Sequence, residues 1–305
     1  MDVTGTAQLF GGAFPIAHQI KSRIRNRWGL TCSIGIGPNK LLAKLASGMQ
    51  KPDGLVEIAS EQVPQILEYL PVEELCGIGD RLKEHLASMG ITTCGELGKM
   101  SEELLIERFG MIGSYLHRMG RGEDESPVVP MGESAPAKSM SHCHTLDQDL
   151  YDFESLKALL LFLSEKIASR LRADRALART VTLTIRLPNF ETHTRSRTLQ
   201  GPTDDGLSIY QTACHLFWRH GSIKKGIRLA GVGVSGLIRG ERQEFLFREE
   251  KRRRFVNEAL DAIHEKWGED LLLRGSTLYL TERHRHYHLK GHHGRLSPGL
   301  QLIDR

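Results

Sequence analysis

The sequence predicts an α+β protein made of several domains, and three observations lead to this prediction. Residues 1–60 alternate helix and strand signals, and residues 61–125 carry short helical segments separated by glycines. Residues 139–240 follow the order β-α-β-β-α-β. The length of 305 residues is enough for two or three such domains.

Residues 1–66 are expected to form a small α/β segment. The spacing of isoleucines predicts a helix over 14–27 that Gly29 ends. Short strands are predicted at 30–36 and 55–58, with a helix between them that runs to about Met49 and has Pro38 near its first position. Two strands are too few to close a sheet, so this segment is expected to be only part of an α/β domain.

The next boundaries follow from composition. Residues 67–125 show repeated glycines and little strand signal, which predicts a domain of short helices. Residues 126–138 are rich in Pro, Gly and Ser, which is typical of a linker.

Residues 139–240 are expected to form the second folded region. Strands are predicted at 139–146, 180–187, 191–199 and 227–237, with helices at 153–173 and 204–218. This order is that of a ferredoxin-like split β-α-β fold. Residues 241–275 include a helix over 253–267, and residues 276–305 are expected to be a polar tail in which five histidines are solvated rather than bound to metal.

Charge and cysteine usage narrow the class of protein. The net charge is +4, with a slightly acidic region at 1–137 followed by a basic region at 138–240, a weak indication of nucleic-acid binding. No apolar run is long enough to span a bilayer and no secretory leader precedes the first helix, so we expect a cytoplasmic protein without a membrane partner. Five single cysteines without a C-x-x-C pair predict free thiols, not disulfides or zinc ligands.

The segment Leu75-Cys76-Gly77-Ile78-Gly79, followed by a predicted helix over 80–89, has the pattern of a helix-hairpin-helix. Two glycines allow a tight turn, and the helix that follows offers free N–H groups to a DNA phosphate. The alternative is a purely structural glycine turn between packed helices.

Three further motifs carry charge or exposed apolar groups. Lys40 and Lys44 share one helix face, which suits a phosphate or is simply solvated. Arg195 and Arg197 share one face of a predicted strand that alternates with hydroxyl residues, which suits DNA phosphates or again water. The segment 243–247 has three large apolar residues in a charged stretch, which indicates a docking peptide or a segment packed on its own domain.

In this order, over about residues 2–275, the motifs resemble the Y-family DNA polymerases of the bacterial polymerase IV type. The stretch from Gly35 to Ser47 is similar to the family's palm, Leu75 to Gly79 to its thumb, and 139–240 to its little finger. The resemblance implies roles for particular residues. It implies nucleotide binding by Lys44, DNA binding by Gly77, Ile78, Gly79, Lys138, Ser139, Arg195 and Arg197, and sliding-clamp binding by Gln243, Leu246 and Phe247.

The resemblance also implies a translesion DNA-directed DNA polymerase that acts as a monomer with primer-template DNA, deoxynucleoside triphosphates and a bacterial sliding clamp. In the family, the residues matching Asp2-Val3-Thr4 directly follow a strand that reads roughly Ser-Ile-Asp-Glu-Ala-Tyr-Leu, and its Asp-Glu pair, with an Asp near the N-terminus, holds two magnesium ions. These carboxylates are absent from the 305 residues, and Asp2 does not replace them. We therefore expect an N-terminally truncated member without fingers, with no catalytic and no metal-ligating residue.

Two functions of different classes follow. The first is the C-terminal portion of a translesion polymerase that is inactive alone, and the second is a DNA- and clamp-binding module without catalysis.

A leucine codon read as an initiator would explain the start at Met1, and a stop codon directly upstream would contradict that explanation.

Overall fold

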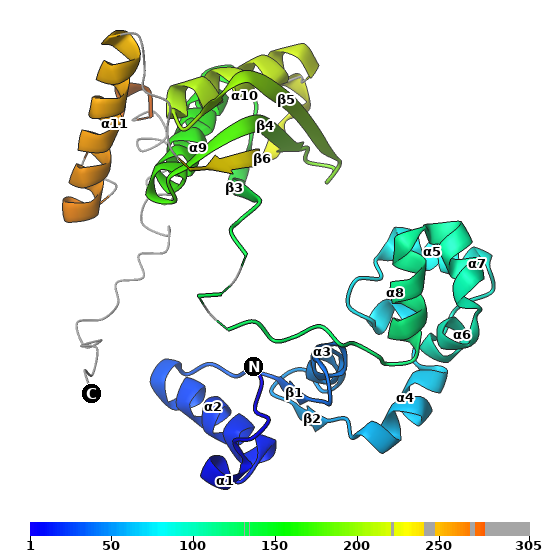
Figure 1. The fold of residues 1–305 in the computed structure, drawn as a ribbon. Coiled ribbons are helices and arrows are strands. Elements are labelled where there is room, and N and C mark those ends of the chain that lie inside the picture. Colours follow the sequence, from blue (N-terminus) through cyan, green and yellow to red (C-terminus); the bar gives the residue numbers. More distant parts are fainter. Residues whose placement is uncertain (131, 134, 221–222, 241–247, 269–271, 278–305) are drawn as a thin grey trace. The chain divides into compact units, whose positions relative to one another are not determined.

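The computed structural model describes residues 1–130, 132–133, 135–220, 223–240, 248–268 and 272–277 (Figure 1). The chain divides into two compact units, Met1–Ser134 and Ala135–Arg305. Among the described residues, no helix is both long enough and apolar enough to cross a lipid bilayer.

The first unit contains a two-stranded sheet and eight α-helices within its described part. Its elements are α1 (Ala7–Phe10), α2 (Ala13–Trp28), β1 (Ile34–Ile36), α3 (Lys40–Met49), β2 (Leu55–Glu57), α4 (Val63–Tyr69), α5 (Asp80–Ser88), α6 (Cys94–Lys99), α7 (Glu102–Phe109) and α8 (Met111–Gly120), with 3-10 turns at Ser60–Gln62 and Val72–Glu74.

Strands β1 and β2 are parallel, with Ile34 opposite Leu55. The strand predicted over 30–36 is wrong in its first half, since only Ile34–Ile36 finds a partner strand. Helix α3 packs directly on β1 because Gly35 has no side chain; a Cβ there would lie 2.1 Å from the Ala43 carbonyl oxygen. Pro38 lies near the start of the helix as predicted, two residues before its first residue Lys40, and Asn39 between them caps the helix by accepting a hydrogen bond from the Leu42 N–H.

The predicted helix over 14–27 is confirmed as α2, and Gly29 ends it in the left-handed conformation at φ 67°. Lys21 anchors this helix to the sheet. Its Nζ donates to the carbonyl oxygens of Cys32 at 2.6 Å and Asp53 at 2.8 Å and pairs with Asp53 Oδ1 at 2.6 Å. Apart from Ala17, no described side chain of α2 is fully buried, so the polar contacts of Lys21, whose side chain is 16% exposed, add to its attachment.

Helices α4 to α8 form the helical region predicted over 67–125. Their core is continuous with that of α3, and fully buried members include Leu42, Leu75, Leu86 and Leu105. Helix α5 has the predicted start at Asp80 and ends one residue before the predicted Met89.

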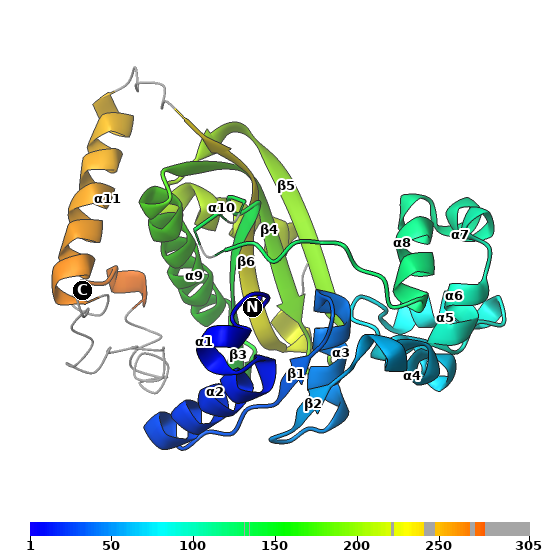
Figure 2. The same ribbon diagram turned by 60° about the horizontal axis from the view of Figure 1, so that its bottom comes forward.

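The second unit has the predicted order β-α-β-β-α-β (Figure 2). Its elements are β3 (Ser139–Leu150), α9 (Phe153–Ala173), β4 (Ala176–Arg186), β5 (Thr192–Thr203), α10 (Gly206–His220), β6 (Ile227–Arg239) and α11 (Arg248–Trp267), with 3-10 turns at Ile223–Lys225 and Gly275–Thr277.

The four strands form one antiparallel sheet in the order β3-β6-β4-β5. Each β-α-β unit is split, because β6 lies between β3 and β4, and β4 lies between β6 and β5. Helices α9 and α10 cover one face of the sheet (Figure 1). The core between these helices and the sheet contains Leu160, Leu163, Ile167, Val181 and Val232. The β-α-β-β-α-β prediction is therefore confirmed.

Candidate nucleic-acid interface

The turn at residues 75–79 is anchored by two buried apolar residues, Leu75 and Ile78, and leaves both glycines exposed. Ile78 is 5% exposed, and its N–H donates to the Leu75 carbonyl at 3.1 Å. Gly77 has a φ of +112°, a conformation that strains any residue with a side chain. A Cβ at Gly77 or Gly79 would meet no atom within 4 Å, so a ligand can approach the backbone closely.

Helix α5 begins directly after this turn, with Gly79 as its N-cap and no side chain bonded to its first N–H groups. By contrast, the side chains of Asn39 and Thr93 cap α3 and α6. Uncapped N–H donors and the positive end of a helix dipole suit an anionic oxygen, such as that of a phosphodiester. The predicted turn geometry is thus confirmed, and its contact with DNA stays a prediction.

The two lysines of α3 have different surroundings. Lys40 donates to the Pro127 carbonyl at 2.9 Å, so its ammonium group already has a partner within the first unit. Lys44 is exposed one turn further along the same helix. Both lysines are exposed, and an ammonium group has three donors, so phosphate binding by either of them stays a prediction.

The face of the four-stranded sheet opposite the helices is lined by short polar residues. Residues directly paired across neighbouring strands share a face, so the register defines rows that cross all four strands. Hydroxyl groups bond within these rows, with 2.9 Å between Thr182 Oγ1 and Ser196 Oγ. Three consecutive rows are Ser139, Ser235, Thr180 and Thr198; Ser141, Gly233, Thr182 and Ser196; and Cys143, Gly231, Thr184 and Thr194. We call these twelve positions the hydroxyl face.

Arg195 and Arg197 share a face, as predicted, but it is not the hydroxyl face. The register places Arg195 opposite Leu183 and Arg197 opposite Val181, both of which are core residues. Both arginines remain exposed because β5 is an edge strand of the sheet. The prediction of one strand face with alternating arginines and hydroxyls is wrong, since alternate residues of a strand point to opposite sides.

Lys138 and Ser139 lie where the chain enters the sheet. Both are exposed, and Ser139 begins the first row of the hydroxyl face. Arg239 at the end of β6 fixes this entry, because its Nη2 donates to the Ala137 carbonyl at 2.9 Å and its Nε to Asp174 Oδ2 at 3.1 Å. These residues are separated from Arg195 and Arg197 by the whole width of the sheet.

Sequence reasoning missed most of the hydroxyl face and also Arg186. This arginine is in the next row, opposite Thr192, whose Oγ1 accepts a hydrogen bond from its Nε at 2.9 Å. The alternation Thr180, Thr182, Thr184 was the available signal. It indicates a strand with one polar face, but only the sheet register shows that β3, β5 and β6 add hydroxyls and glycines to the same face.

Gln243, Leu246 and Phe247 lie outside the described residues. Within the described ranges there is no group of three or more His, Cys, Asp or Glu side chains that could hold a metal ion. The described residues therefore do not fit a two-magnesium site.

Three family models match the chain in succession. They are the impB/mucB/samB family over residues 1–48, the DNA polymerase-iota thumb domain over 73–124, and the impB/mucB/samB family C-terminal domain over 137–246. Among solved structures, a Y-family DNA polymerase chimera, Dbh-Dpo4(243-245)-Dbh, has the same fold. Its TM-score is 0.60 at 23% identity, with 79% of this chain and 69% of that chain covered.

Curated relatives extend this similarity over nearly the whole chain. DNA polymerase IV of Moorella thermoacetica is 42% identical over 91% of this chain and 70% of its own length. DNA polymerase IV of Pelotomaculum thermopropionicum is 38% identical over 91% of this chain and 69% of its own length. DNA polymerase IV 1 of Bacillus subtilis is 34% identical over 91% of this chain and 68% of its own length. The chain therefore belongs to the Y-family DNA polymerases, in the DNA polymerase IV group of translesion enzymes.

Proposed function

We propose that these 305 residues hold primer-template DNA by its backbone, without reading base sequence, for a translesion polymerase. The observation that carries the proposal is the hydroxyl face, bordered by the exposed arginines of β5. The hydroxyl face offers hydroxyl donors beside the guanidinium groups of Arg195 and Arg197, and the uncapped turn at 75–79 offers backbone N–H donors.

The chemistry of these side chains favours backbone contacts over base contacts. Base readout in the major groove uses long bidentate side chains such as Arg, Asn and Gln. The three rows of the hydroxyl face contain none of these, only Ser, Thr, Gly and one Cys. Hydroxyl groups, backbone N–H groups and flanking arginines are typical contacts to phosphate and sugar, which position DNA but carry no sequence information.

Further roles are proposed for residues outside the hydroxyl face. Lys44, exposed on α3, would contact the triphosphate of an incoming deoxynucleotide in the complete enzyme. Gln243, Leu246 and Phe247 would dock on a bacterial sliding clamp, with the polymerase acting as a monomer. The 305 residues alone would bind DNA without extending a primer, because the described residues offer no cluster of acids for metal ions.

Two native cysteines allow a direct test of the proposed DNA surfaces. Cys76 is exposed in the 75–79 turn, and Cys143 is exposed on the hydroxyl face, where its Sγ lies over Gly231. We expect duplex DNA of any sequence to slow alkylation of both thiols, as measured by mass spectrometry of peptides. Unchanged alkylation of both thiols at saturating duplex would contradict the proposal.

Cys94 provides the internal control for this experiment. It is buried, and burial raises the pKa of its thiol to about 12. It should remain unmodified with and without DNA, and its modification would show that the protein has unfolded. Primer extension by the same preparation, with magnesium and all four nucleotides, tests the proposed lack of catalysis; extension above a control without protein would overturn that part alone.

A further inference from the structure

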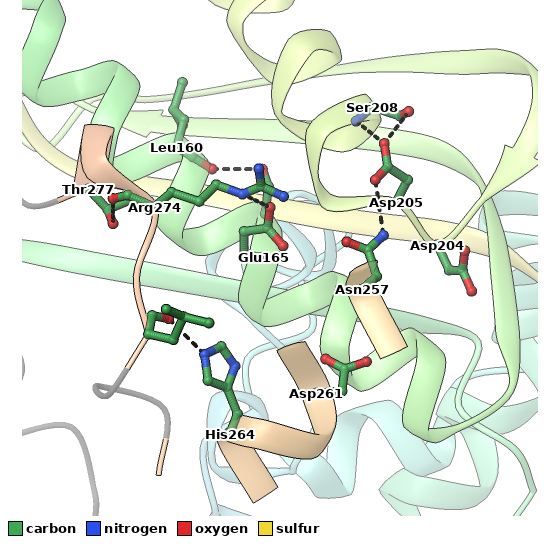
Figure 3. A network of polar contacts seen from close by, with 12 residues as sticks. Leu160, Glu165, Asp204, Asp205, Ser208, Asn257, Asp261, His264, Arg274 and Thr277 are labelled. Atoms are coloured by element: carbon green, nitrogen blue, oxygen red, sulfur yellow. Dashed lines mark hydrogen bonds and ion pairs between the residues drawn. The ribbon is translucent and has the colours of Figure 1, made fainter. Parts of the chain in front are cut away.

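Helix α11 is attached to the second unit by one of its faces. Asn257 is 5% exposed, and its Nδ2 donates to Asp205 Oδ1 at 3.2 Å (Figure 3). Asp261 pairs with Arg172 of α9, and His264 Nε2 is 2.8 Å from the Leu272 carbonyl oxygen. These three residues follow one another at helical spacing, so they define the inner face of α11.

The opposite side of α11 carries cations and one aromatic ring but no acid. Successive residues of a helix are turned by about 100°, so the helical period of α11 places no Asp or Glu along this outer stripe. Phe255 is 66% exposed and lies along the helix between Arg252 and Lys266. The stripe extends for about 27 Å at 1.5 Å per residue. It comprises Arg248, Lys251, Arg252, Phe255, Ala259 and Lys266.

No carboxylate among the described residues forms an ion pair with Arg248, Lys251 or Arg252. Two acids of the same helix pair with other cations, Glu258 with Arg254 and Asp261 with Arg172. Like charges three and four residues apart on a helix repel one another, so an anion placed over them would be stabilising.

From this geometry we propose that the outer stripe of α11 binds single-stranded nucleic acid. Cations spaced along a narrow track suit a phosphodiester backbone, and an exposed aromatic ring between them suits stacking of an unpaired base. In a duplex the bases are already stacked on each other, so Phe255 favours the single strand. This site uses none of the residues of the hydroxyl face or of the 75–79 turn, and it goes beyond the function proposed above.

The helix offers its own matched control for the charges. Lys251→Gln/Arg252→Gln removes two cations from the outer stripe, whereas Arg253→Gln/Arg254→Gln removes the two adjacent cations that flank the inner face. Binding of the full chain to a labelled oligothymidylate would be followed by fluorescence anisotropy as a function of salt. We expect the first pair to weaken binding on the order of tenfold at 0.1 M salt and to reduce the log-log salt slope by about 1.4, at about 0.7 for each phosphate neutralised.

Phe255→Leu separates stacking from charge. It keeps an apolar side chain of similar size but removes the ring, so we expect oligothymidylate affinity to fall by about fivefold or more with an unchanged salt slope. Affinity for duplex DNA should not change. Helix content from circular dichroism shows that each variant is folded.

Equal effects of the two charge pairs on oligothymidylate binding would overturn the proposal, as would full affinity of Phe255→Leu. A loss of binding to phosphatidylglycerol vesicles by Lys251→Gln/Arg252→Gln, with oligothymidylate binding retained, would assign the stripe to lipid instead. None of these results affects the protection of Cys76 and Cys143 by duplex DNA, so the two proposals fail independently.

Discussion

Arg172 of α9 and Asp261 of α11 form a two-pronged ion pair, with 2.5 Å between Nε and Oδ2 and 2.8 Å between Nη2 and Oδ1. The Arg172 side chain is only 9% exposed. Burial by itself would lower the pKa of this guanidinium, but the hydrogen bonds to Asp261 more than offset it and raise the pKa. The same guanidinium also donates to the Asp204 carbonyl at 2.9 Å, so it joins the ends of two helices to α11.

Arg172→Gln should therefore release α11 from the second unit. We expect amide hydrogen exchange throughout α11 to become faster and its local stability to fall by about 1.5–3 kcal/mol, the range for hydrogen bonds to charged groups. Arg254→Gln removes an exposed pair with Glu258 in the same helix and should cost no more than about 1 kcal/mol. Equal exchange rates in the two variants would show that the buried pair does not hold the helix.

The contact between Lys21 and Asp53 predicts a pH dependence in the first unit. The hydrogen bond from Lys21, opposed by some desolvation and aided by the charge of Arg25, holds the pKa of Asp53 below its usual value near 3.8. A carboxyl whose pKa is lowered by folding contributes stability above the unfolded pKa and loses it as the pH falls through the folded pKa.

The thermal unfolding temperature of Asp53→Asn should therefore be lower than that of the parent chain at neutral pH. The two unfolding temperatures should converge below about pH 4. Glu57→Gln, at an exposed position of β2, should follow the parent chain at every pH. If the unfolding temperatures of Asp53→Asn and the parent chain differ by a constant amount across the acid range, the carboxylate charge is not what stabilises α2.

The salt dependence of duplex binding tests the arginines of β5. Replacing Arg195 or Arg197 by Ala should lower the log-log salt slope by about 0.9 for each phosphate that the arginine neutralises. Lys157→Ala removes a cation of α9 that pairs with Glu154 and should leave the slope unchanged. If Arg186→Ala lowers the slope while both β5 variants do not, the hydroxyl face alone meets the DNA.

Two glycines give opposite predictions for the same change. Gly35→Ala would place a Cβ 2.1 Å from a backbone oxygen of α3, and we expect it to destabilise the first unit by about 1–3 kcal/mol. Gly48→Ala, within α3, meets nothing within 4 Å and should stabilise the helix by about 0.5–1 kcal/mol. Chemical denaturation of both variants measures the difference, and a neutral Gly35→Ala would show that α3 can move off β1.

Local signals were enough to predict most elements. Helix α9 has the predicted bounds 153–173 because a long run of periodic apolar residues follows an Asp152 side chain that caps its start. Helix α11 begins at Arg248, not at the predicted 253, because its first turn is all charged and shows no apolar period. The predicted strand over 30–36 is confirmed only for Ile34–Ile36, because only these three residues have a partner strand.

The candidate site was harder to predict because it depends on pairing between distant strands. That Arg195 and Arg197 share a face follows from the two-residue period of any strand. Whether this face is the hydroxyl face or the helix-covered face depends on the register of β5 with β4, which places Leu183 opposite Arg195. The anchoring of Lys21 by the carbonyl of Asp53 is equally invisible in the sequence, since 32 residues separate the two.

The proposed clamp peptide gives a prediction that depends on sequence alone, since residues 243–247 lie outside the described part of the chain. Binding energy in such peptides is concentrated in a few apolar anchors, so Leu246→Ala/Phe247→Ala should lose about 2–4 kcal/mol of affinity for a bacterial sliding clamp. Glu244→Ala, at a position that is not an anchor, should retain it, and duplex binding should be unchanged in both because the hydroxyl face and the 75–79 turn lie elsewhere in the chain. Surface plasmon resonance on immobilised clamp measures the difference. Full clamp affinity of the double variant, or unfolding of the second unit, would show instead that Leu246 and Phe247 pack on their own domain.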